Sequence, residues 1–303
     1  MGQNGSRIGE VAARTGLSVR AIQMITGQDE GPVPSTDLLS AALHRWDCAV
    51  DGDPLRGGTA VIIPVRSVDG SELIVKLLDA EAATREALAL RAFPPTASVQ
   101  CLDHLPDLGA LLLERLTPAP LAGVPIDEQI TIQSRLARAL AVPAPEGIDR
   151  LSSERLAHHL TNLRHGAPGH LAGRVIDRAH ATISNLDSDP TSTLTHGDLH
   201  SLNVHQDHKG VWRALDPNPH VGTIAFESHT VIAERPRLGE LIQAGDRELR
   251  RRLGIFADIA EVDCVLAERL CQARAVMSAL YEQARGATEL ADQLRWMATT
   301  LTP

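Results

Sequence analysis

The 303-residue sequence is 43% apolar and 22% charged, a composition typical of a globular protein with a core of substantial size. Because only 2% of the residues are aromatic, that core must be built from Leu, Ala, Val and Ile. The net charge of −9 argues against a nucleic-acid partner and is compatible with a cationic small ligand, and no apolar run approaches the roughly 18 residues of a membrane helix.

The first 47 residues predict a small helical extension and a linker. RIGEVAARTGLSVRAIQ (7–23) has the pattern of two short helices around a Gly turn, and it resembles the opening of MerR-type helix-turn-helix regulators. The resemblance stops there, so a DNA-binding or other non-catalytic regulator is the remoter alternative. GQDEGPVPSTD (27–37) indicates a linker, and DLLSAALHRWD (37–47) a short amphipathic helix.

Residues 48–117 predict a small β-rich lobe. AVIIPVRSVDGSELIVKLL (60–78) contains two β-rich runs separated by a Val-Asp-Gly-Ser turn, which is the signature of a hairpin. AEAATREALALRAF (80–93) has helical spacing of its apolar residues, and 98–116 indicates two further strands around a turn.

Residues 118–303 predict a large helical lobe, which begins where Pro118 and Pro120 break the pattern. Helical patterning covers 127–186 with Pro and Gly interruptions, and it returns after residue 236 in three runs. The fold class predicted is therefore α+β, a small β-rich lobe followed by a large helical one.

Four cysteines, Cys48, Cys101, Cys264 and Cys271, match neither a zinc pattern nor a disulfide framework. Cys264 and Cys271 are seven residues apart on a predicted helix, so we expect both to be buried on one face. The N-terminus lacks an apolar run after a basic start, and we expect a protein of the reducing cytoplasm.

The stretch THGDLHSLNVHQDHKGVWRALDPNP (195–219) carries the residues of a phosphoryl-transfer site. Asp198 precedes Asn203 by five residues in an H-x-D-x-x-x-x-N frame, and Asp216 follows the apolar run VWRAL. Such a reaction needs a carboxylate that orients the acceptor hydroxyl and takes its proton. It also needs an amide oxygen and a second carboxylate that hold Mg²⁺ against the phosphates.

THGDLHSLNV and ALDPNP resemble the catalytic loop and metal-binding motif of the aminoglycoside phosphotransferase family, which has a protein-kinase-like fold. Gly197 stands where the protein-kinase loop has arginine, as it does in this family. DPNPHVG (216–222), GGT (57–59) and LLLERL (111–116) are most similar to the streptomycin 6-phosphotransferase and hydroxyurea kinase branch. The similarity covers roughly residues 45–303. It implies ATP and Mg²⁺ as cofactors, with Asp198 catalytic and Asn203 and Asp216 as metal ligands.

The resemblance implies further nucleotide-binding residues upstream. Lys76, at the end of ELIVK, is expected to hold the α and β phosphates and to pair with Glu86 on the next helix, with Glu81 as a less favoured partner. The backbone of the Gly-Gly-Thr turn, Gly57, Gly58 and Thr59, is expected to approach the phosphates. The backbone groups of Glu114 and Leu116 are expected to form the hinge that bonds adenine.

The phosphate acceptor is expected between the catalytic loop and the C-terminal helices. We expect Glu227 and Glu234 to face cationic groups there, and His200 to contact phosphate or substrate, with Asp258, Glu261 and Asp263 as lesser candidates. The segment GTIAFES departs from the Gly-Asp-Pro usual at this point in the family. A streptomycin-like aminoglycoside and a role in resistance are favoured. Hydroxyurea, a nucleoside antibiotic and a biosynthetic intermediate stay open.

Five histidines crowd the same stretch: His196, His200, His205, His208 and His220. A metal hydrolase is the alternative to the kinase interpretation, but no HExxH or comparable ligand spacing is present. We expect His196 to pack beneath the loop and bond its backbone, and His205 and His208 to lie in a solvated hairpin turn.

Overall fold

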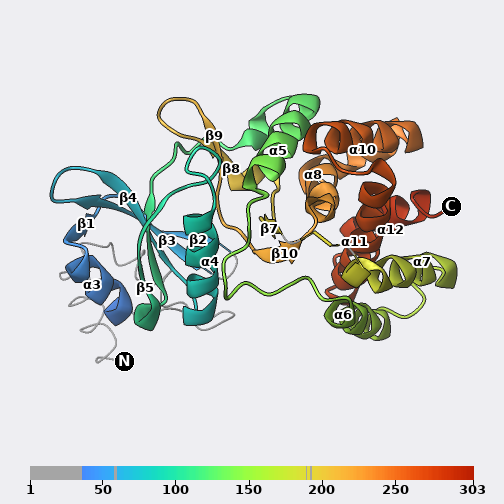
Figure 1. Ribbon diagram of the computed structural model, residues 1–303, viewed down its shortest axis with the longest axis horizontal. Coiled ribbons are helices and arrows are strands. Elements are labelled where there is room, and N and C mark those ends of the chain that lie inside the picture. The colour runs from blue at the N-terminus through green and yellow to red at the C-terminus, as the bar shows by residue number, and fades with distance from the viewer. Residues whose placement is uncertain (1–35, 58–59, 189, 192) are drawn as a thin grey trace. The chain divides into compact units, whose positions relative to one another are not determined.

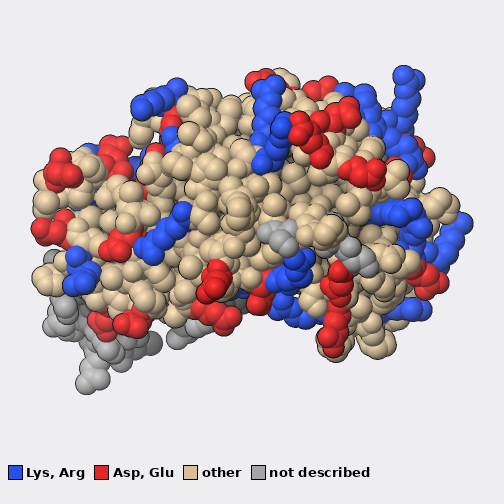
Figure 2. Space-filling model, in the orientation of Figure 1, with Lys and Arg blue, Asp and Glu red and all other residues tan. Residues whose placement is uncertain are grey.

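The computed structural model in Figure 1 describes residues 36–57, 60–188, 190–191 and 193–303, so the helix-turn-helix predicted at 7–23 lies outside the described residues. The chain forms two compact units. One comprises the residues up to Arg91 together with Ser98–Thr117, and the other comprises Ala92–Ala97 and Pro118–Pro303. Every helix among the described residues is too short or too polar to span a bilayer. On the face shown in Figure 2, Lys and Arg side chains are interspersed with Asp and Glu.

The first unit is a six-stranded antiparallel sheet with two helices. The strand order is β1-β3-β4-β6-β5, with β2 paired to β3. The elements are α3 Thr36–Arg45, β1 Cys48–Val50, β2 Leu55–Gly57, β3 Ala60–Ser67, β4 Glu72–Leu77, α4 Ala80–Ala92, β5 Cys101–Leu105 and β6 Ala110–Glu114. The predicted hairpin is confirmed as β3–β4. Its turn contains Gly70 at φ +88°, a conformation that glycine adopts without strain.

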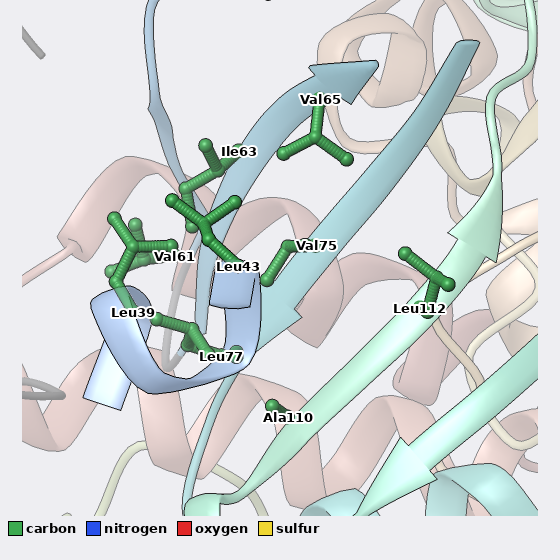
Figure 3. Packing of buried hydrophobic residues seen from close by; sticks show 10 residues of the cluster. Leu39, Leu43, Val61, Ile63, Val65, Val75, Leu77, Ala110 and Leu112 are labelled. Atoms are coloured by element: carbon green, nitrogen blue, oxygen red, sulfur yellow. The ribbon is translucent and has the colours of Figure 1, made fainter. Parts of the chain in front are cut away.

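The core of the first unit lies between α3 and one face of the sheet (Figure 3). Leu39 and Leu43 of α3 pack against a layer of buried aliphatic side chains, namely Val61, Ile63, Val65, Val75, Leu77, Ala110 and Leu112. Because side chains alternate along a strand, Lys76 points to the opposite face from its neighbours Val75 and Leu77. The alternation therefore brings the ammonium group of Lys76 to the face that carries α4, where it meets Glu86.

The second unit is mainly helical and contains two small β-ladders. The elements are α5 Ile126–Leu140, α6 Ser153–Gly166, α7 Gly173–Ser184, β7 Thr193–Thr195, β8 Val204–Gln206, β9 Trp212–Ala214, β10 His220–Gly222, α8 Ser228–Ile232, α9 Leu238–Ala244, α10 Asp246–Ala260, α11 Cys264–Ala284 and α12 Thr288–Thr300. The first run after residue 236 is broken in two by Gly245, whose φ of +81° ends α9 before α10 begins. With these helices and the antiparallel sheet, the α+β class is confirmed.

The expectation of two buried cysteines on α11 is half wrong. Cys271 is fully buried, but Cys264 is exposed. Cys264 is the first residue of α11, directly after the N-cap Asp263, whose carboxylate accepts a hydrogen bond from Leu266 N at 2.7 Å. Sharing a helix face does not give burial in the first turn, because that turn extends beyond the elements packed against the helix.

The aliphatic core of the first unit should be sensitive to the truncation of a single side chain. Ile63 is fully buried, whereas Val68 in the hairpin turn is 80% exposed. We expect Ile63→Ala to lower the free energy of unfolding of this unit by about 2–5 kcal/mol, because it removes buried apolar area and leaves a cavity. Urea denaturation followed by circular dichroism measures the change. Val68→Ala is the matched control and should shift the curve little; equal shifts would contradict this assignment of the core.

Candidate active site

Two antiparallel ladders in the second unit bring the motif segments together. β7 pairs with β10, with Thr195 opposite His220, and β8 pairs with β9, with Val204 opposite Ala214. The loop between β7 and β8 and the segment after β9 are joined by backbone hydrogen bonds from Leu215 N to Asn203 O (2.9 Å) and from Asn218 N to His196 O (2.8 Å). The segments that carry the Asp-Asn-Asp set therefore lie against one another.

Asp198 and Asn203 are in direct contact within this loop. The side-chain nitrogen of Asn203 donates to the backbone oxygen of Asp198 at 3.0 Å and lies 3.5 Å from its Oδ2. Asn203 is buried, whereas 46% of the Asp198 side chain is exposed. Asp216 is exposed and has φ +60°, an uncommon conformation for a residue with a Cβ. The carboxylate of Asp198 thus faces outward, and the amide of Asn203 is fixed behind it.

Gly197 is required by the shape of the loop. Its φ is +81°, and a Cβ at this position would lie 1.9 Å from the backbone oxygen of Asn218. An arginine, which protein kinases carry here, has no room in this backbone. The close approach of the two segments therefore depends on the missing side chain.

His196 links the same two segments from beneath, as predicted. It is 1% exposed, its Nε2 lies 3.1 Å from Leu215 O, and its Nδ1 accepts a hydrogen bond from Asp198 N at 3.3 Å. A ring nitrogen that accepts from an amide carries no proton, so the geometry assigns the proton to Nε2. His208 is exposed in the β8–β9 turn, as predicted, whereas His205 lies within β8 opposite Arg213 and is only partly exposed.

Glu227 has a different position from the substrate contact expected for it. It is fully buried, and one carboxylate oxygen accepts the N–H of Gly197 from below the loop. Burial raises its pKa, while the hydrogen bond from Gly197 and the nearby charge of Arg274 act in the opposite direction. Glu227 therefore holds the loop from below. It does not line the surface recess that opens beside Asp198 and is described below.

Glu234 supports the next part of the loop. It is 4% exposed, and its two oxygens accept hydrogen bonds from Ser201 N (2.7 Å) and Ser201 Oγ (2.8 Å). Gln133, fully buried on α5, donates to Leu199 O at 2.8 Å. Sequence reasoning missed Gln133, whose only signal was a polar residue in the apolar stripe of a helix. Glu234 does line the recess, but with both oxygens already engaged.

A recess of about 310 Å³ opens beside Asp198, a size at the lower end of ligand pockets. His200 lines it, and His200 Nε2 lies 3.6 Å from Asp198 Oδ2. Sequence reasoning did not single out two other lining residues, His229 on α8 and Arg274 on α11. The signal for Arg274 was a lone arginine among alanines in an otherwise apolar stretch of helix.

The three lesser acidic candidates lie outside the recess, and two of them have structural partners. Asp263 caps α11, and Glu261 forms an ion pair with Arg138 at 2.6 Å. Asp258 is exposed on α10. None of the three lines the recess.

The first unit contains a buried ion pair between Lys76 and Glu86. Lys76 Nζ lies 2.7 Å from Oε1 and 2.6 Å from Oε2 of Glu86, and each residue is 3% exposed. The alternative partner Glu81 is exposed on the first turn of α4. The pairing expected from the sequence is present, and it orients the lysine from the sheet toward α4.

The other predicted nucleotide contacts lie at strand ends. Gly57 ends β2, opposite Ala60 of β3, while Gly58 and Thr59 lie outside the described residues. Glu114 ends β6, and its N–H donates to Gln100 O at 3.0 Å; Leu116 follows two residues later and is half-buried. No group of three or more His, Cys, Asp or Glu in the described part of the chain is placed to hold a metal ion.

Comparison with known proteins places these features in a family. A family model described as aminoglycoside/hydroxyurea antibiotic resistance kinase matches residues 45–286. A streptomycin 6-kinase from Streptomyces glaucescens is 28% identical over 265 residues, 84% of each chain. A hydroxyurea phosphotransferase from Kitasatospora aureofaciens is 34% identical over 214 residues, which are 66% of this chain and 61% of the relative.

A solved structure shares the fold. An aminoglycoside phosphotransferase in ternary complex with ADP and hygromycin B has a TM-score of 0.57 at 12% identity, over 86% of this chain and 96% of that one. The protein-kinase-like fold predicted from the motifs is therefore confirmed.

The buried carboxyl of Glu227 predicts a specific pH dependence of stability. Its pKa in the folded protein lies above the ordinary 4.5, so the folded state keeps a proton that the unfolded chain has lost. The stabilisation is full below the unfolded pKa and is lost as pH rises through the folded pKa. Glu227→Gln cannot ionise, yet its amide oxygen can still accept the Gly197 N–H. We expect its melting temperature to fall less than that of the wild type between about pH 5 and about pH 8.

Thermal melts across this range measure the effect. Glu289→Gln, an exposed change on α12, is the control and should follow the wild type. Parallel curves for Glu227→Gln and the wild type would contradict the raised pKa.

Proposed function

The chain belongs to the aminoglycoside/hydroxyurea antibiotic resistance kinase family, as its motifs predicted, and we propose that it transfers the γ-phosphoryl group of ATP to a hydroxyl of an antibiotic or similar small molecule. The enzyme class, a small-molecule phosphotransferase, follows from the family. The observation that carries the finer proposal is the outward-facing carboxylate of Asp198 at the recess, with Asn203 bonded directly behind it.

Asp198 is the proposed base. Its carboxylate accepts a hydrogen bond from the acceptor hydroxyl and takes the proton as the oxygen–phosphorus bond forms and the bond to the leaving ADP oxygen breaks. The loop supports described above keep this carboxylate in place before the acceptor arrives. Holding two reactants in line in this way removes much of the entropic barrier to their reaction.

Asn203 and Asp216 are the proposed ligands of Mg²⁺, and their chemistry fits that ion. The nitrogen of Asn203 is used toward Asp198, so its side-chain oxygen is directed away from that bond. An amide oxygen and a carboxylate are hard donors of the kind Mg²⁺ prefers. Bound there with ATP, the ion would neutralise charge on the phosphates.

Lys76 is the proposed anchor of the α and β phosphates. A buried ammonium paired to Glu86 is held in one orientation, which favours a fixed contact with an anion. The backbone of Gly57, Gly58 and Thr59 is proposed to cover the phosphates, and backbone groups of Glu114 and Leu116 to bond the adenine edge. This reaction would take place in the cytoplasm, where ATP is available.

The acceptor is proposed to be an antibiotic, and its modification to confer resistance. The relatives, by name, include a streptomycin kinase and a hydroxyurea phosphotransferase, so both compound types are candidates, with nucleoside antibiotics and biosynthetic intermediates behind them. The mixed charges on the face in Figure 2 offer no support to the alternative of a DNA-binding regulator.

Replacing the proposed base tests the reaction. We expect Asp198→Asn to lower turnover by about 10²-fold or more, since the amide cannot take the hydroxyl proton, and to leave ATP binding largely intact. Purified protein with Mg²⁺-ATP is mixed with streptomycin, hydroxyurea and nucleoside antibiotics, and mass spectrometry detects a gain of one phosphoryl group. Asp258→Asn on α10 serves as the control. Undiminished turnover in Asp198→Asn would remove the assignment.

Removing the lysine tests the phosphate anchor separately from folding. Lys76→Met leaves Glu86 buried without its partner, which we expect to cost about 3–5 kcal/mol of stability as well as ATP affinity. The double variant Lys76→Met/Glu86→Gln removes both charges and should regain stability but not ATP affinity. Urea denaturation and calorimetric titration with Mg²⁺-ATP separate the two effects. Recovery of ATP affinity in the double variant would refute the anchoring role.

A further inference from the structure

The recess beside Asp198 contains a fixed cation, Arg274. Its Nη1 donates to Phe226 O at 3.2 Å and to Thr230 Oγ1 at 2.7 Å, and the guanidinium lies 4.6 Å from the centre of the Phe226 ring. These contacts hold the group in one orientation. Its remaining N–H groups donate to no protein atom within the described residues, so they are available to a ligand in the recess that Arg274 lines.

His229 lines the same recess and lacks a protein partner. It is 8% exposed, and neither ring nitrogen forms a hydrogen bond within the described part of the chain. Burial lowers its pKa well below the ordinary value, and the charges of Arg274 and Arg235 lower it further, so the ring is neutral. Buried polar atoms are nearly always satisfied by protein or by ordered water, so the unpaired imidazole is available to a water molecule or a ligand in the recess.

Glu234, a carboxylate that lines the recess, is already engaged, because both of its oxygens accept hydrogen bonds from Ser201. Glu227 lies outside the lining; one of its oxygens accepts the Gly197 N–H, and the other is buried. Asp198 is the proposed base. At the rim, Arg235 is a second cation, paired with Glu282 at 2.9 Å. A guanidine or ammonium group of a substrate would therefore meet arginines and a neutral imidazole. Apart from the proposed base Asp198, the described lining holds no carboxylate that is free to bind such a group.

We propose that Arg274 and His229 bind a carbonyl or carboxylate oxygen next to the hydroxyl that is phosphorylated, and that the acceptor is a neutral or anionic hydroxylated compound and not a polycation. This inference rests on the proposed phosphotransferase activity and narrows its substrate class. A planar guanidinium matches the geometry of such oxygens, and a neutral imidazole can donate its single N–H to the same group.

Small probes of matched size test the chemistry without turnover. Glycolamide and glycolate carry a carbonyl or carboxylate beside a hydroxyl, whereas ethanolamine carries an ammonium group in its place. Ligand-observed NMR titrations of the full chain measure the three dissociation constants. We expect glycolamide and glycolate to bind about 10-fold or more tightly than ethanolamine, the factor that corresponds to one charge-assisted hydrogen bond. Equal or tighter binding of ethanolamine, or no binding of any probe, overturns the proposal.

Variants assign the preference to the two residues. Arg274→Gln should abolish it, and Arg274→Lys should keep part of it for glycolate alone, because the charge remains but the planar fork is lost. His229→Phe keeps a ring of similar shape without the nitrogens, and it should weaken glycolamide binding. Arg269→Gln, an exposed arginine on the same helix, is the matched control. A preference that survives in both Arg274→Gln and His229→Phe overturns the proposal.

Turnover with Mg²⁺-ATP separates this inference from the function on which it rests. We expect hydroxyurea, which has a carbonyl beside its hydroxyl, to give a higher kcat/KM than the polycation streptomycin, and Arg274→Gln to remove that advantage. If streptomycin is the better substrate, the phosphotransferase stands and the acceptor proposal fails. If the probes show the preference but no compound gains a phosphoryl group and ATP does not bind, the acceptor chemistry stands and the proposed function fails.

Discussion

The loop that carries Asp198, the proposed base, depends on one constraint, the need of its buried backbone groups for hydrogen-bond partners. The loop between β7 and β8 contains only a short 3-10 turn, Ser201–Asn203, so it cannot satisfy all of these groups itself. Buried side chains supply the partners: Glu227 accepts from Gly197, Gln133 donates to Leu199 O, and Glu234 accepts from Ser201. Because each support comes from a different element, the direction of Asp198 is fixed by the packing of the whole second unit.

A similar relation between burial and function holds in the first unit. Taking an ammonium and a carboxylate out of water costs more free energy than most ion pairs return, so the Lys76–Glu86 pair is weak evidence for stability. Perturbed and buried ionisable groups concentrate where chemistry requires them. The pair is therefore better explained by the need for one oriented charge on the sheet than by a contribution to folding.

Sequence reasoning succeeded where the signal is local. The β3–β4 hairpin and the helix α4 both follow from neighbours in the chain. It failed where burial is decided by distant elements. Nothing near Glu227 in the sequence says that Gly197 lies above its carboxylate, and Arg274 owes its place to the packing of α11 against α8. Gly245 shows the same limit, because its left-handed backbone splits a run whose periodicity indicated one helix.

Glu227 and Glu234 bind the loop that carries Asp198, although the sequence had suggested that they face a cationic substrate. The overall charge of the protein is therefore a poor guide to its acceptor. A net charge of −9 is a property of the whole surface, whereas recognition depends on the few groups that face the recess. Once Glu227 and Glu234 are committed to the loop, the acidic balance of the chain no longer favours a cation at that point. The donors left unpaired there, on Arg274 and His229, favour an oxygen acceptor instead. Because these two side chains face the recess and the loop supports do not, substrate class is better judged from the recess than from overall charge.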